Sequence, residues 1–137
     1  MKAIKYVSVL VIITCLLFVN ENSFSQFNKI NVNVWKGMAS YYHPKFNGRK
    51  TTNGEIFSNR KLTCANNFLR LGTYILVSNL KNGVSVIVKV NDRMHPGNKR
   101  LIDLSQAAAN KLGFLNQGLG EVRIQVLTDE EGNIAFN

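Results

Sequence analysis

Two carboxylates stand at loop boundaries, where they could carry out acid–base chemistry. Asp92 follows a run rich in valine, and Glu55 ends a long polar stretch. A carboxyl group in such a place can donate a proton, accept one or stabilise a developing positive charge. A structural interpretation competes with this one, because an aspartate that starts a loop commonly forms an Asx turn and a loop-end glutamate is commonly solvated.

The other reactive side chains are few. The two histidines, His43 and His95, each lie beside a proline in a loop, and either imidazole could enter a groove formed by the loops. A metal site requires more ligands than these, so we expect no metal and no other cofactor. Cys64 has no histidine close in sequence to activate it, which favours a buried side chain over a reactive thiol.

Composition indicates an ordinary globular protein with one domain. The 137 residues suffice for a single hydrophobic core. Lysine and arginine total 17 against 8 acidic residues, and the resulting net charge of +9 attracts polyanions. The basic residues are scattered singly and match no nucleic-acid-binding motif, so nucleic acid is not the expected partner. A bacterial envelope, with its acidic polymers and lipid head groups, is the alternative polyanionic environment.

Residues 1–25 have the profile of a signal peptide. A short positive segment precedes an apolar run over 6–19, and small residues lie just before a cleavage site at Gln26. The run is shorter than the roughly 20 apolar residues of a membrane span, although an uncleaved anchor is an alternative. Cys15 lies inside the run without the flanks of a lipidated cysteine, so lipid anchoring is not expected. We therefore expect an exported protein in which 26–36 lead into the folded domain.

The elements that must position the two carboxylates are mostly short strands. Alternating apolar and polar residues, or β-rich runs, predict strands over 31–42, 73–79, 84–91, 100–104 and 121–127. An Asn-Gly pair at 82–83 predicts a tight hairpin, and Ser105 and Gly113 frame a short helix over 106–112. Residues 43–60 have no periodicity and indicate one long functional loop. Such a pattern favours a closed β-barrel with a flexible tail over 128–137.

Six short motifs follow one another along residues 37–127. They read GMASYY at 37–42, FNGRKTTNGE at 46–55, LGT at 71–73, NDR at 91–93, IDLS at 102–105 and AA at 107–108. In this order and spacing they resemble the rare lipoprotein A family. The resemblance implies a mainly β fold, a six-stranded double-psi β-barrel with one or two short helices, over residues 37–127.

The resemblance also implies an activity. It is that of an endolytic peptidoglycan lytic transglycosylase, which cleaves glycan strands between MurNAc and GlcNAc, leaves 1,6-anhydro-muramic ends and prefers strands without stem peptides. The implied partners are glycan strands, with cell-division proteins as further candidates, and a monomer is expected. The implied place is the periplasm or cell envelope.

Asp92 and Glu55 match positions of catalytic interest in that family. Asp92 is expected to act first as acid and then as base, which requires a raised pKa. Glu55 is expected across the same groove, where it would stabilise charge or position substrate. The family's histidine falls on Asn66, and this departure favours an alternative, a non-catalytic expansin-like module that binds or loosens wall polysaccharide. A third possibility is a protein-interaction domain on a retired enzyme scaffold.

Substrate binding is expected from four residues: Tyr42, His43, Asn66 and Arg93. Tyr42 or its neighbour Tyr41 offers a flat face to a sugar, and strand alternation places the other in the core. Arg93 is expected on the face opposite Asp92, either in an ion pair or in contact with substrate. Asp103 and Ser105 are expected at the helix entry, where capping is favoured over catalysis.

Overall fold

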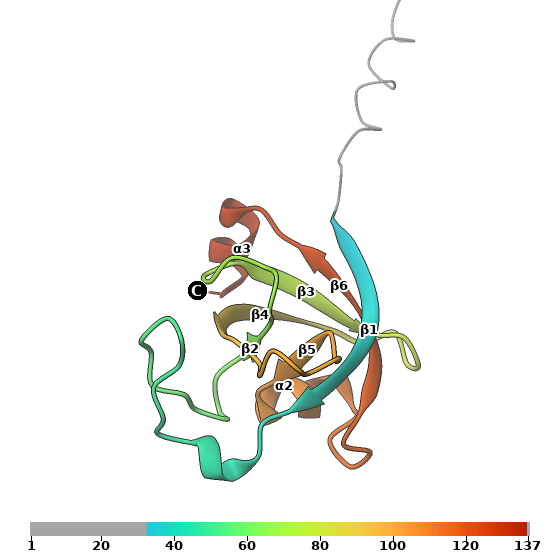
Figure 1. Ribbon diagram of the computed structural model, residues 1–137. Helices are drawn as coiled ribbons and strands as arrows, with labels where there is room; N and C mark the ends of the chain where they lie inside the picture. Colours follow the sequence, from blue (N-terminus) through green and yellow to red (C-terminus); the bar gives the residue numbers. More distant parts are fainter. Residues whose placement is uncertain (1–32, 137) are drawn as a thin grey trace, which may run out of the picture. The chain divides into compact units, whose positions relative to one another are not determined.

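The structure is a computed structural model that describes residues 33–136. The predicted signal peptide, its cleavage site and Cys15 lie outside this range. Within it, six strands close into a barrel in the order β1-β5-β2-β4-β3-β6, as Figure 1 shows. This confirms the predicted six-stranded, mainly β architecture of a double-psi barrel. No helix among the described residues is long and apolar enough to cross a membrane.

The barrel is built from short elements of mixed direction. Its strands are β1 (Val34–Tyr41), β2 (Thr63–Ala65), β3 (Tyr74–Asn79), β4 (Ser85–Asp92), β5 (Ile102–Leu104) and β6 (Gly120–Val126). Its helices are the 3-10 turn η1 (Pro44–Phe46), α2 (Gln106–Leu112) and α3 (Asp129–Phe136). The β1–β5 and β2–β4 pairs are parallel, and the other neighbours are antiparallel.

Strand β4 shows how the sequence specifies the barrel wall. Val86, Val88 and Val90 are buried, whereas the intervening Ile87 and Lys89 are partly exposed, so one face of the strand enters the core. Each buried valine contributes about 1.5–3 kcal/mol of burial free energy. The hairpin that joins β3 to β4 turns at Gly83, whose φ of 73° suits glycine. The predicted hairpin is confirmed.

Helix α2 closes one side of the core, as predicted. The Ser105 hydroxyl accepts a hydrogen bond from the Ala108 N–H and caps the helix. Gly113 ends it with a φ of 81°, in the left-handed region. Ala108 and Leu112 are fully buried, so the small and apolar face of α2 packs into the barrel.

The structure bears on two predicted boundaries. Residues 34–36 are expected both in the lead-in and in the strand over 31–42, and they belong to strand β1, because their backbone pairs with β6, with Val34 opposite Gln125. The predicted flexible tail instead forms α3, whose Phe136 ring lies 5.1 Å from the ring of Tyr74. Sequence alternation also missed β2, since its three residues are all buried and leave no period to detect.

Candidate active-site groove

A cavity of about 630 Å³ opens where the ends of β1, β4 and β5 meet the long loop after β1. We call this cavity the groove. Asp92 and Asp103 line it together with Ser40, Tyr42, His43, Arg93 and His95. In the barrel, β1, β5, β2 and β4 are successive neighbours. The last residues of β1 and β4 can therefore line the same groove. Barrel closure therefore unites side chains that are far apart in sequence.

Asp92 is held in the groove by four hydrogen bonds. Its Oδ1 accepts hydrogen bonds from the Thr52 N–H at 2.9 Å, the Thr52 hydroxyl at 2.7 Å and the Arg93 N–H at 2.9 Å. Its Oδ2 accepts one from the Tyr42 hydroxyl at 2.7 Å. These four donors leave Oδ2 with spare acceptor capacity for a ligand.

The electrostatics of Asp92 differ from the expectation. Burial acts to raise the pKa of Asp92, but the hydrogen bonds from Thr52, Tyr42 and the backbone N–H groups outweigh it, and the pKa lies below its ordinary value. The expectation that its setting in the protein raises this pKa is therefore wrong. Burial and the bond to Asp92 raise the pKa of Tyr42, which keeps its phenol protonated as the donor.

Tyr42 lies at the centre of an aromatic cluster on the groove wall. Its ring centroid lies 4.3 Å from that of Phe57 and 5.7 Å from that of Phe46. Neighbouring Tyr41 points the other way and donates its hydroxyl to the Leu115 carbonyl at 2.6 Å, packed against the core. One tyrosine thus packs against the core, as strand alternation predicts. Both tyrosines are among the lining residues of the groove, and Tyr42 is the one whose hydroxyl bonds to Asp92.

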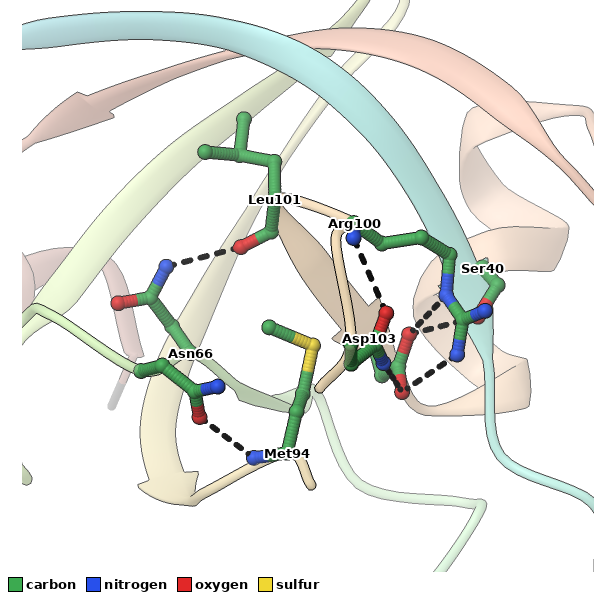
Figure 2. Close-up of polar contacts among 8 residues, drawn as sticks. Ser40, Asn66, Met94, Arg100, Leu101 and Asp103 are labelled. Atoms are coloured by element: carbon green, nitrogen blue, oxygen red, sulfur yellow. Dashed lines mark hydrogen bonds and ion pairs between the residues drawn. The ribbon is translucent and has the colours of Figure 1, made fainter. Parts of the chain in front are cut away.

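Asp103 is the second carboxylate of the groove, and sequence reasoning placed it only at the helix entry. Figure 2 shows its carboxylate facing Ser40 and the guanidinium of Arg100. The Ser40 hydroxyl donates to Oδ1 at 2.6 Å, and Arg100 forms a two-point ion pair at 2.9 and 3.2 Å. Ser105, not Asp103, caps α2. In sequence, Asp103 lies between the apolar residues Ile102 and Leu104. Because side chains alternate along a strand, this pattern indicates that Asp103 points away from the core.

Glu55 is not across the groove from Asp92, and this expectation is wrong. Its carboxylate accepts hydrogen bonds from Lys89 Nζ at 3.0 Å and Asn91 Nδ2 at 3.1 Å, and it does not line the groove. Those bonds lower the pKa of Glu55 to about 2. Lys89 and Asn91 are two residues apart on β4, so they share a face, and Asp92 projects from the other one.

Asn66 is fully buried and does not reach the groove, so the expectation that it binds substrate is wrong. Its side-chain oxygen accepts from the N–H groups of Phe68 and Leu69, at 3.0 and 2.7 Å. Its amide donates to the Leu101 carbonyl at 2.9 Å, as Figure 2 shows. The side chain thus forms a turn and ties the end of β2 to the segment that precedes Asp103.

Arg93 and the two histidines do line the groove. Arg93 Nη1 donates to the Asn66 carbonyl at 2.6 Å, and no ion pair of Arg93 occurs within residues 33–136. His43 Nδ1 accepts from the Lys45 N–H and His95 Nδ1 from the Gly97 N–H, so each Nε2 is left for other partners. Both imidazoles thus lie at the groove, as the sequence analysis allowed for either of them.

Cysteine and metal chemistry have no support in the described part of the chain. Cys64 is fully buried, and burial raises the pKa of its thiol, which confirms the predicted inert side chain. Among residues 33–136, no three histidine, cysteine, aspartate or glutamate side chains gather in a way that could hold a metal ion.

Fold and groove together define a double-psi β-barrel protein with an acidic pair at the mouth of the barrel. The barrel superposes on the Streptomyces papain inhibitor with a TM-score of 0.58 at 23% identity, covering 73% of this chain and 100% of that one. It matches the d78n mutant of Clavibacter michiganensis expansin, in complex with cellohexaose, with a TM-score of 0.58 at 22% identity, covering 71% and 52%. At these identities the likeness concerns the fold.

The chain belongs to the lytic transglycolase family, whose sequence profile matches residues 34–124. A relative from Haemophilus influenzae, the endolytic peptidoglycan transglycosylase RlpA, is 44% identical over 109 residues, which cover 79% of this chain and 38% of the relative. The chain spans less than half the length of the curated relatives it matches.

Proposed function

We propose that the protein is an endolytic peptidoglycan lytic transglycosylase that cleaves MurNAc–GlcNAc strands and leaves 1,6-anhydro-muramic ends. The observation that carries the proposal is Asp92, held by Thr52 and Tyr42 in a groove with room for sugar rings. Membership of the lytic transglycolase family, with relatives named for this activity, supports it.

Asp92 carries the proton in this mechanism. Protonated Asp92 gives its proton to the glycosidic oxygen as the bond from that oxygen to the anomeric carbon breaks, and charge develops on the muramic ring. The C6 hydroxyl of the same ring then bonds to the anomeric carbon, and its proton returns to Asp92. No water is consumed, and Asp92 ends in the state in which it began.

Substrate must shift Asp92 toward its protonated form, because the hydrogen bonds of the protein itself hold its pKa below the ordinary value. A sugar above the carboxylate excludes water, and burial already acts on Asp92 in the raising direction. Asp103 lines the same groove, where its carboxylate is paired with Arg100. The exclusion of water by the sugar is therefore the change that favours a protonated Asp92.

Substrate contacts and location follow from the same proposal. Tyr42, Arg93 and His43 bind the sugars, and glycan strands without stem peptides are the substrate. The protein acts outside the cytoplasm, in the periplasm or cell envelope, after removal of residues 1–25. It works as a monomer, and cell-division proteins are candidate partners.

Purified protein incubated with peptide-free glycan strands tests the proposal. Mass spectrometry should detect 1,6-anhydro-muramic products, and Asp92→Asn should abolish them because the amide cannot cycle a proton. Circular dichroism should show that this variant stays folded. Absence of anhydro products with the wild-type protein contradicts the proposal.

A non-catalytic wall-binding module is the second candidate. One observation favours it: neither Glu55 nor Asn66, at two positions of catalytic interest in the family, reaches the groove. Sedimentation with the polymer without any anhydro product identifies this alternative in the same assay.

A further inference from the structure

The groove carries more positive than negative charge. Five cationic side chains line it, and they face two carboxylates: Lys45, Arg49, Lys50, Arg93 and Arg100 against Asp92 and Asp103. Two of the five are already engaged, since Arg100 pairs with Asp103 and Arg93 donates to the Asn66 carbonyl. The surplus cations must therefore be explained by something other than the groove's own acids.

Lys45 and Arg49 are the surplus cations with a defined position. Lys45 Nζ lies 5.3 Å and the Arg49 guanidinium carbon 5.1 Å from the centroid of the Phe46 ring. Cation–π contact restrains a cationic group over a ring without occupying its hydrogen-bond donors. Neither side chain forms an ion pair within residues 33–136. Both side chains are exposed and restrained, and their donors are available to an anion.

These cations lie close to the carboxylate that is proposed to react. The ring of Phe46 packs edge-on against Tyr42, with centroids 5.7 Å apart, and the Tyr42 hydroxyl bonds to Asp92 at 2.7 Å. One aromatic contact thus separates the cation pair from the Asp92–Tyr42 pair. An anionic group on a sugar next to the cleaved bond would fall within reach of Lys45 and Arg49.

We propose that Lys45 and Arg49 form a carboxylate-binding subsite for the free lactyl carboxylate of a muramic acid residue. The proposal rests on the proposed function for the identity of the sugar. Muramic acid carries this carboxylate on a flexible ether arm, and attachment of a stem peptide converts it to a neutral amide. The subsite therefore distinguishes a free lactyl group from an amidated one by the charge at that position, and the amide leaves both cations without a partner there.

The test compares two small probes: N-acetylmuramic acid and its lactyl methylamide, which differ in the charged group. Binding to Asp92→Asn, measured by calorimetry at low salt, should favour the acid by about tenfold, as expected for two exposed cations. In Lys45→Gln/Arg49→Gln this preference should disappear. The matched control is Lys81→Gln/Arg123→Gln, which removes the same charge from side chains outside the groove and should keep the preference.

The outcomes separate the subsite from the activity. Equal binding of the two probes, binding of neither, or a preference that survives in Lys45→Gln/Arg49→Gln overturns the subsite. A preference lost equally in the control also overturns it, because general charge would then be the cause. A preference for the acid in a protein that makes no anhydro products supports the subsite and refutes the transglycosylase proposal. Cleavage of bare and amidated strands at equal kcat/KM supports the transglycosylase proposal and overturns the subsite.

Discussion

Asp92 shows how few neighbours determine the state of a reactive side chain. A hydroxyl and an N–H from Thr52, the Tyr42 hydroxyl and the Arg93 N–H stabilise its ionised form more than burial destabilises it. In the proposed mechanism the same residue must be protonated when the glycosidic bond breaks. Bound substrate would exclude water and thereby strengthen the effect of burial over that of the hydrogen bonds, which raises the pKa of Asp92.

The pH profile should reveal this rise of the pKa. Because the reacting form is protonated, activity falls as pH rises through the pKa of Asp92. The limb of kcat/KM reports the free protein, where the pKa is lowered, and the limb of kcat reports the complex, where it is raised. Steady-state rates from about pH 3 to pH 8 should therefore place the kcat limb at the higher pH. Coincident limbs would contradict the role of substrate.

Glu55 should behave as a structural carboxylate. Its pKa of about 2 lies below the ordinary value of 4.5, so the hydrogen bond from Asn91 and the ion pair with Lys89 contribute stability above about pH 4.5 that is lost as pH falls toward 2. Glu55→Gln should lower stability at pH 7 by less than about 1 kcal/mol, since the pair is partly exposed. Thermal unfolding at pH 7 and pH 3 checks this: the gap between variant and wild type should narrow at pH 3. A constant gap would show that the ion pair is not its source.

At the level of elements, Asn66 connects the two segments that carry the groove carboxylates. Its amide holds the Leu101 carbonyl, two residues before Asp103, and its backbone carbonyl holds Arg93, one residue after Asp92. The short strand β2 pairs with both β4 and β5, and the bonds of Asn66 add to that pairing in fixing how the two segments lie relative to each other.

Asn66→Asp should therefore affect turnover as well as folding. The carboxylate keeps the acceptor but loses the donor to Leu101, at a cost of about 1–3 kcal/mol for a buried unpaired group. Asn79 is a matched control, because its buried amide donates to the Leu112 carbonyl at 2.8 Å and its oxygen accepts from the Lys81 N–H, away from the groove. Melting temperatures should fall both in Asn66→Asp and in the control variant Asn79→Asp. Only Asn66→Asp should lower kcat, by about tenfold or more, through displaced carboxylates.

At the scale of the whole molecule, charge and barrel closure act together. The net charge of +9 is spread over the chain, whereas closure gathers five cations around one groove. Such a positive field attracts acidic polymers at long range, and the proposed subsite would bind their anionic groups at short range.

Salt should separate the two effects on kinetics. Added salt screens exposed cations over about 10 Å at 0.1 M, so KM for bare glycan strands should rise several-fold between about 0.05 and 0.5 M while kcat changes little. Initial rates across that range check the expectation, with an osmotically matched neutral solute as control. A fall of kcat at constant KM would indicate that salt acts on the reacting groups instead.

The sequence by itself determined the local structure and the family. The β3–β4 hairpin follows from alternating valines and the Asn-Gly pair, and α2 follows from Ser105 and Gly113, because turns and caps depend on neighbours within a few residues. The motifs likewise predicted the barrel and the place of Asp92 in the groove. These features require no knowledge of which distant strands pair.

Only the tertiary structure decided which side chains share the groove. A bulge in the β2–β4 pairing sets Ala65 opposite Asp92, and the alternation of β4 sends Asn91, with Glu55, to one face and Asp92 to the other. Asp103 joins Asp92 because β5 pairs in parallel with β1, next to Tyr42. These outcomes depend on register between segments far apart in the chain, which no local pattern encodes.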